Sequence, residues 1–146
     1  MSLVWSADTR VAVQEHAERG YPDEVCGLLI GSFDGEDKVV RQVVPVENEW
    51  EAVDERRRRF LITPDVFARQ ERQARRDGLE IVGFYHSHPD HPAEPSATDR
   101  EYAWPLYSYL IQSVVGGHVA DFASWRLKDD RSGYEREEVT ELKVEG

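Results

Sequence analysis

The residues of this chain that could perform chemistry lie close together in the sequence. His86 and His88 stand one residue apart at the end of an apolar run, and Ser96 and Asp99 follow shortly after. Side chains alternate along a strand, so histidines at positions i and i+2 point to the same side. Imidazole nitrogens and carboxylate oxygens are typical ligands of zinc. The spacing therefore predicts a Zn²⁺ site formed by His86, His88 and Asp99.

The number of ligands indicates what kind of zinc site this is. Two nitrogens and one oxygen leave the fourth tetrahedral position to water, which is typical of a catalytic zinc. A structural zinc is closed by four protein ligands, usually cysteines, and this chain has one cysteine. We therefore expect one Zn²⁺ with a bound water.

Glu24 and Ser96 are the candidates for the remaining catalytic roles. A water activated by zinc needs a carboxylate or a histidine that takes its proton without binding the metal. Glu24 directly precedes an apolar run, residues 25–33, where a charge is unusual unless it is used. The Ser96 hydroxyl is expected to donate a hydrogen bond to the oxyanion of a tetrahedral intermediate.

Each of these residues also has a plainer interpretation. Ser96 and Asp99 fit a variant of the capping box, with serine as the helix cap and an acid three residues later. The two interpretations are compatible, because a cap would fix the backbone that aims Asp99. The plainer interpretation of Glu24 is a solvated charge, which the pattern favours less than a functional role. A pair of histidines at a strand end, taken alone, is usually exposed on the surface without a function. The combination of all these residues at these offsets favours a metal site.

Other candidates are weaker. Cys26 is expected to be a small buried residue, not a nucleophile. His91 is expected to be exposed in a proline-rich loop, where it is able to touch a substrate. His16 and His118 are expected to be structural or surface residues. The four arginines 56–59 are flanked by acids, which favours a solvated segment over a nucleic-acid patch.

The surrounding pattern predicts one domain, residues 1–146, of mixed helices and strands, in the α/β or α+β class. A loop is expected over 47–57, and a short helix between Ser96 and Pro105. The longer helices are expected at 6–19, which Gly20 would cap, and at 63–78. Strands are expected at 25–33, 38–46, 60–62, 80–85, 107–115, 119–127 and 137–144.

The composition excludes some partners. Lys and Arg total 18 and Asp and Glu total 29, so the formal net charge is −11. A general nucleic-acid binder needs a surplus of cations, and so does a protein that binds an anionic membrane surface. The uncharged stretch 102–120 contains Pro105, two glycines and polar residues, so we interpret it as strand and turn. With no secretion signal evident and one cysteine, we expect a cytoplasmic protein.

The same residues resemble the JAMM family of metalloproteases, also called the JAB1/MPN/Mov34 domain. The segment 22–31, Pro-Asp-Glu-Val-Cys-Gly-Leu-Leu-Ile-Gly, is similar to the segment found in prokaryotic members. The family pattern is a Glu, then His-Ser/Thr-His, seven residues, Ser, two residues and Asp. Its positions are filled here by Glu24, His86, Ser87, His88, Ser96 and Asp99.

The resemblance implies a fold and an activity. The fold would be a curved mixed β-sheet flanked by helices, similar to cytidine deaminases. His86, His88 and Asp99 would bind zinc, Glu24 would be general base and then general acid, and Ser96 would stabilise the oxyanion. The substrate would be the amide or isopeptide bond after the terminal glycine of a ubiquitin-like or sulfur-carrier protein with a Gly-Gly tail.

Two alternatives remain open at this stage. One is a zinc hydrolase that acts on a small-metabolite amide. The other is a non-catalytic module that binds a ubiquitin-fold partner. A linkage-selective deubiquitinase is not expected, because the chain is too short for the long insertions that grip a second ubiquitin.

Overall fold

The computed structural model describes residues 2–48, 50, 55, 62–97, 99 and 103–142. In these residues the chain forms two helices and a mixed seven-stranded sheet, which confirms the predicted α+β class. The helices are α1 (Ala7–Gly20) and α2 (Pro64–Arg76). The strands are β1 (Ser2–Trp5), β2 (Cys26–Asp34), β3 (Asp37–Val46), β4 (Glu80–Pro89), β5 (Ser108–Val115), β6 (His118–Leu127) and β7 (Tyr134–Glu141).

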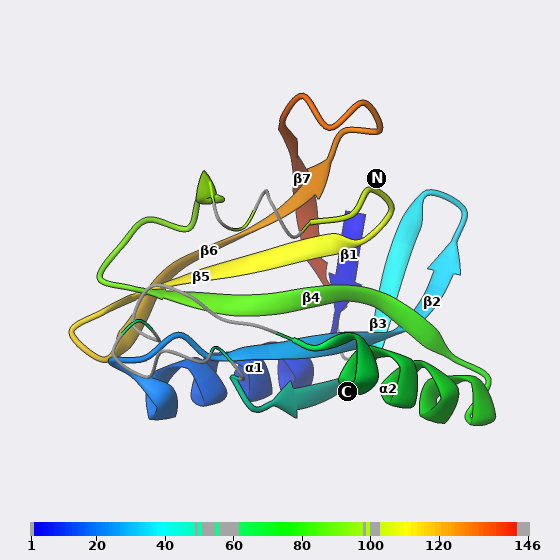
Figure 1. The fold of residues 1–146 in the computed structure, drawn as a ribbon, viewed down its shortest axis with the longest axis horizontal. Coiled ribbons are helices and arrows are strands. Elements are labelled where there is room, and N and C mark those ends of the chain that lie inside the picture. Colours follow the sequence, from blue (N-terminus) through cyan, green and yellow to red (C-terminus); the bar gives the residue numbers. More distant parts are fainter. Residues whose placement is uncertain are drawn as a thin grey trace.

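The sheet is more strongly curved than the sequence alone indicates, because it closes into a barrel (Figure 1). The strand order is β1-β3-β2-β4-β5-β6-β7, and β1 pairs in parallel with both β3 and β7. Strand β1 was not predicted, since its four residues form a strand by pairing with β3 and β7, which lie far along the chain. β4 and β5 are also parallel, and the other neighbours are antiparallel.

The ends of the helices follow from local sequence. Thr63 caps α2 by accepting a hydrogen bond from the Val66 N–H, Pro64 is its first residue, and Gly78 has the positive φ of +74° that ends it. The prediction for α1 was wrong in one respect. Gly20 is the last residue of the helix and Tyr21 is the cap, and Gly20 is needed because a Cβ there would collide with Val25.

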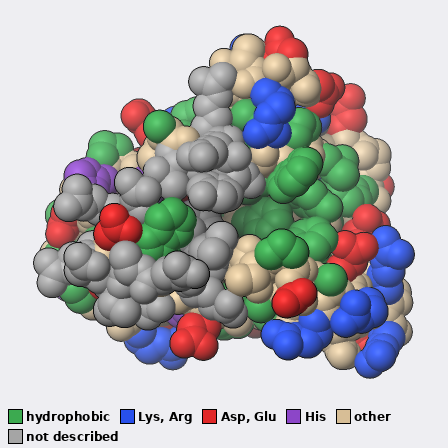
Figure 2. All heavy atoms as spheres, in the orientation of Figure 1, with side chains coloured by type: hydrophobic (Ala, Val, Ile, Leu, Met, Phe, Trp, Pro, Cys, Tyr) green, Lys and Arg blue, Asp and Glu red, His purple; other side chains and the backbone are tan. Residues whose placement is uncertain are grey.

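The two helices cover opposite faces of the curved sheet. The buried residues Val13 and Ala17 of α1 share one core cluster with Trp5, whereas Ala74 of α2 belongs to the other, with Phe84. Lys and Arg side chains gather at the end of the molecule where Figure 1 shows α2, beside a group of hydrophobic side chains (Figure 2). No helix in the described part of the chain is long and apolar enough to cross a membrane.

A buried ion pair ties β3 to β7. The Lys38 Nζ lies 3.0 Å from Glu137 Oε2, and the hydroxyls of Ser108 and Ser124 donate to Glu137 Oε1. All four side chains are buried. A buried charge is tolerated where it is paired and hydrogen-bonded in this way, but periodicity does not reveal such pairs, and the sequence analysis did not find this one.

Other expected elements differ at their ends. The last strand is β7, which begins and ends three residues before the predicted 137–144. β4 continues through residue 89, so both histidines lie inside a strand and not beyond it. Residues 60 and 61 of the predicted strand 60–62 lie outside the described residues. So do most of the loop 47–57, the arginines 56–59, and residues 98 and 100–102 of the predicted short helix after Ser96.

The closure of the barrel by β1 is testable through Trp5, which is 1% exposed and packs against Phe122 with ring centroids 5.4 Å apart. Trp5→Ala is expected to lower the free energy of unfolding by about 3–5 kcal/mol, as for other buried aromatic residues. Urea denaturation measures this. The control is Trp104→Ala, since Trp104 is 65% exposed and its loss should cost about 0.5 kcal/mol or less. An equal loss of unfolding free energy in Trp5→Ala and Trp104→Ala would contradict the burial of Trp5 in the closed barrel.

Candidate active site

The two predicted histidine ligands project from β4 onto one face of the sheet. Phe84, His86 and His88 alternate with Tyr85 and Ser87 along this strand, and Phe84 packs in the core cluster that includes α2. His86 is 1% and His88 7% exposed. β4 is held between β2 and β5, with His86 opposite Cys26 on one side and Ile111 on the other. The two imidazoles are therefore fixed by an interior strand.

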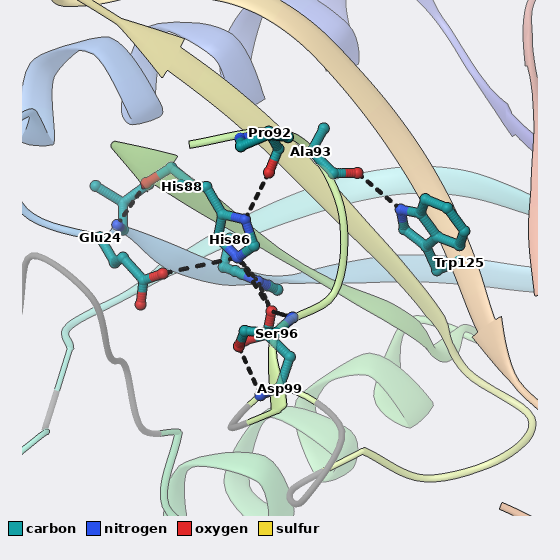
Figure 3. Close-up of polar contacts among 10 residues, drawn as sticks. Glu24, His86, His88, Pro92, Ala93, Ser96, Asp99 and Trp125 are labelled. Atoms are coloured by element: carbon teal, nitrogen blue, oxygen red, sulfur yellow. Dashed lines mark hydrogen bonds and ion pairs between the residues drawn. The ribbon is translucent and has the colours of Figure 1, made fainter. Parts of the chain in front are cut away.

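Asp99 reaches the histidines from the start of a helical segment. Ser96 and Asp99 form a reciprocal cap, in which the Asp99 N–H donates to Ser96 Oγ at 3.0 Å and the Ser96 N–H donates to Asp99 Oδ2 at 2.9 Å. This confirms that the capping box and the ligand interpretation are compatible, because the cap aims the carboxylate at the histidines (Figure 3).

Three ligand atoms converge at this point. Asp99 Oδ2 lies 3.1 Å from His86 Nε2 and 3.0 Å from His88 Nε2, and the two Nε2 atoms lie 3.1 Å apart. Ligands of a tetrahedral zinc with bonds of about 2.0–2.1 Å stand about 3.3 Å apart, so these spacings fit the metal. In the described part of the chain, these three residues form the one group of His, Cys, Asp and Glu able to hold an ion.

Hydrogen bonding and charge also suit a cation. His88 Nδ1 lies 2.9 Å from the Pro92 carbonyl oxygen, which requires the proton on Nδ1 and leaves a lone pair on Nε2. Burial lowers the pKa of His86, against the opposing effect of Asp99, so its neutral form is favoured. Burial by itself would raise the pKa of Asp99, but His86 and His88, in the forms that carry a proton on Nε2, lower it well below its usual range through their charge and hydrogen bonds. The cluster thus offers lone pairs and an anion.

The loop that supplies the Pro92 carbonyl is fastened to the barrel. The indole N–H of Trp125 on β6 donates to the Ala93 carbonyl at 3.0 Å, and Ala93 packs with Ile111 and Ala123 (Figure 3). The sequence analysis missed Pro92 and Trp125. Backbone carbonyls leave no signal in residue types, and Trp125 is adjacent to the loop only in the folded chain.

Glu24 lies beside the three candidate ligands without joining them. Its side chain is 3% exposed, and Oε1 is 3.8 Å from His88 Nε2. Oε2 has no hydrogen-bond partner among the described residues. Burial, and next the charge of Asp99, raise the pKa of Glu24 to about 9 in the metal-free chain. A buried carboxyl with one oxygen that has no hydrogen-bond partner among the described residues, next to a cluster of candidate ligand atoms, indicates a functional group.

A cleft of about 320 Å³ opens onto these residues. His91, predicted to be exposed in the proline-rich loop, is exposed and lines the cleft. Cys26 is buried, as predicted. His16 is half-buried and lies 2.7 Å from the Tyr85 hydroxyl, away from the cleft. The lining residues are Glu24, His88, Pro89, His91, Pro92, Glu94, Pro95 and Ser96.

The chain belongs to the family of prokaryotic homologues of the JAB domain, whose family model matches residues 6–128. It is 40% identical over 123 residues to a desampylase of Haloferax volcanii, which covers 81% of this chain and 85% of the relative. It is 34% identical over 129 residues to a CysO-cysteine peptidase of Mycobacterium bovis, which covers 87% of this chain and 84% of the relative.

Solved structures agree on the fold. A protein from Desulfitobacterium hafniense superposes with a TM-score of 0.82 at 31% identity, covering 97% of this chain and 94% of that one. A JAB1/MPN domain protein from Archaeoglobus fulgidus superposes with a TM-score of 0.57 at 18% identity, covering 98% of each chain. The expected MPN-type fold is therefore confirmed.

The metal site is testable by zinc titration. Asp99→Asn keeps the size of the side chain and a carbonyl oxygen for the Ser96 cap, but removes the anionic ligand. It is expected to weaken zinc binding by at least about 100-fold, more than the loss of an outer hydrogen bond causes. Glu94→Gln is the control, since it removes an acid from the same cleft that contacts no ligand atom in the structure. Unchanged affinity in Asp99→Asn would remove Asp99 from the ligand set.

The raised pKa of Glu24 predicts a pH-dependent stability in the metal-free chain. Between about pH 5 and pH 9 the unfolded state ionises Glu24 and the folded state does not, so stability falls as the pH rises. Glu24→Gln cannot ionise, so its stability relative to wild type is expected to increase over this range, by up to about 1.4 kcal/mol per pH unit. Denaturation in chelator at several pH values measures it, with Glu94→Gln as the exposed control. If the difference in unfolding free energy between Glu24→Gln and wild type stays constant from about pH 5 to pH 9, the pKa of Glu24 is not raised as described.

Proposed function

We propose that this protein, as a single domain of residues 1–146, is a zinc-dependent peptidase. Its substrate would be the amide or isopeptide bond after the C-terminal glycine of a ubiquitin-like or sulfur-carrier protein. The observation that carries the proposal is the convergence of His86, His88 and Asp99 on one point, with the buried carboxyl of Glu24 beside it. The names of the relatives, a desampylase and a CysO-cysteine peptidase, support this substrate class.

The residues divide the reaction among them. Zinc held by His86, His88 and Asp99 would supply a Lewis acid and lower the pKa of a water in its open position. Glu24 accepts the proton of the attacking water and delivers it to the leaving amine. A nearby cation lowers the pKa of a carboxyl, so metal binding would bring Glu24 from about 9 towards the range that suits both transfers.

Ser96 and the cleft complete the proposed site. The Ser96 hydroxyl lies at the cleft and accepts a hydrogen bond from the Asp99 N–H, which leaves its own proton to donate to the oxyanion. Three prolines, Pro89, Pro92 and Pro95, line the cleft and restrict its shape. A tail that ends in Gly-Gly suits such a cleft because glycine allows the backbone to approach closely.

Intact-mass spectrometry tests this function. The zinc-loaded protein is mixed with the sulfur-carrier and ubiquitin-like proteins of its own organism, each bearing an amino acid or a lysine amide on its terminal glycine. We expect wild type to release the free glycine terminus. Glu24→Gln should retain zinc and lose at least about 100-fold in turnover, because the proton acceptor is gone.

The control and the alternatives are part of the same experiment. Glu36→Gln, at an exposed turn outside the cleft, is expected to retain turnover. A Glu24→Gln variant as active as wild type would refute the role of Glu24. Binding of a carrier without cleavage would favour a non-catalytic module, and turnover of small amides alone would favour a hydrolase of metabolite amides.

A further inference from the structure

The carboxyl of Glu24 is not held by hydrogen bonds of its own. Its Oε2 has no partner among the described residues, and its Oε1 is 3.8 Å from His88 Nε2, beyond hydrogen-bond distance. A group that accepts and releases protons needs such freedom, but it must still lie within about an ångström of its working position. The placement of this carboxyl therefore depends on its backbone.

That backbone is held at both ends of one peptide group. The carbonyl oxygen of Glu24 accepts a hydrogen bond from Asn48 Nδ2 at 3.2 Å. The N–H of the same peptide, on Val25, donates to Ser87 Oγ at 2.9 Å in a buried environment. With its carbonyl and its N–H both engaged by side chains, the Glu24–Val25 peptide cannot rotate without breaking a hydrogen bond.

Ser87 acts where the ladder between β2 and β4 ends. The Ser87 N–H donates to the Val25 carbonyl at 3.1 Å, as in an antiparallel pair, but the Val25 N–H bonds to the serine side chain. β2 begins only at Cys26, so the chain leaves the sheet at this hydroxyl. Ser87 is fully buried and, by alternation, faces away from the two histidines between which it stands.

We propose that Ser87 is a positioning residue for Glu24, which acts by holding the Glu24–Val25 peptide together with Asn48. The tripeptide His86-Ser87-His88 of β4 would therefore serve two purposes. Its histidines present the candidate ligand atoms on one face of the sheet, and Ser87, which faces the other way, positions Glu24. This inference rests on the proposed function, because it takes Glu24 to be the proton acceptor.

The first test is kinetic, on a conjugate that the mass assay shows to be cleaved. Ser87→Ala is expected to lower kcat by roughly 10- to 100-fold, as small misplacements of catalytic groups do. KM should stay within about twofold, and zinc content should not change, because no ligand atom is touched. Ser87→Thr keeps the hydroxyl and should recover most of the lost kcat.

A matched control separates positioning from simple stability. Ser124→Ala also removes a fully buried hydroxyl, one that bonds to Glu137. It is expected to lower the melting temperature as Ser87→Ala does, yet to keep kcat. If Ser87→Ala prevents folding, Asn48→Ala provides a second test, because Asn48 is half-buried. It removes the hydrogen bond to the Glu24 carbonyl oxygen, the other contact that holds the Glu24–Val25 peptide, and is expected to lower kcat in the same way.

The second test needs no substrate and no metal. Amide hydrogen exchange of the Val25 N–H should be slow in the metal-free wild type and at least about tenfold faster in Ser87→Ala, with the amides of β5 unchanged. Fast exchange of the Val25 N–H in the wild type would show that Ser87 does not hold this peptide and would overturn the proposal.

The outcomes distinguish this inference from the proposed function. Inactive Glu24→Gln with a fully active Ser87→Ala would overturn the positioning role and leave the function standing, as would an equal loss of kcat in Ser124→Ala. A fully active Glu24→Gln, or no cleavage of any conjugate, would overturn both. Three results together would support the positioning role of Ser87. They are a lower kcat with normal zinc content in Ser87→Ala, a recovered kcat in Ser87→Thr, and faster exchange of the Val25 N–H in Ser87→Ala.

Discussion

Strand β4 sends Phe84, His86 and His88 to one face of the sheet and Tyr85 and Ser87 to the other, and the candidate site depends on this alternation. Because β4 lies between β2 and β5, its backbone is hydrogen-bonded on both sides and cannot shift its register without moving every side chain to the wrong face. The two imidazoles are therefore held in fixed positions. Asp99 and Glu24, which come from different parts of the chain, approach them there.

The convergence is built from caps and loops whose own hydrogen bonds fix them. Asp99 is aimed by its reciprocal cap with Ser96, and His88 is fixed by the Pro92 carbonyl in a loop that Trp125 fastens to β6. Glu24 is the exception, because its carboxyl lacks such bonds. The desolvation that raises its pKa and the positive charge expected at the ligand cluster act in opposite directions, which suits a group that exchanges protons.

Charge is used in two distinct ways in this chain. The cluster of His86, His88 and Asp99 gathers nitrogen atoms and a carboxylate at one point, an arrangement able to hold a cation. Lys38 and Glu137 are equally buried, but they neutralise each other and Glu137 is further satisfied by two serine hydroxyls. That group joins β3 to β7 and is complete without a ligand. Burial of charge alone therefore does not identify a site, whereas a buried acid without a hydrogen-bond partner beside a cluster of ligand atoms is a candidate for one.

The sequence by itself predicted the candidate ligands, the adjacent acid and the capped turn, because these depend on local spacing: a period of two on a strand and three residues across a cap. It also determined the central strands and both long helices, whose apolar runs and start signals are local. The tertiary structure decided the rest. β1 closes the barrel through partners over thirty and over one hundred residues away, Gly20 is required by Val25, and Asn48 and Ser87 hold a peptide that neither adjoins in sequence. Such contacts depend on which distant segments pack together, and that is settled by burial over the whole chain and not by any short pattern.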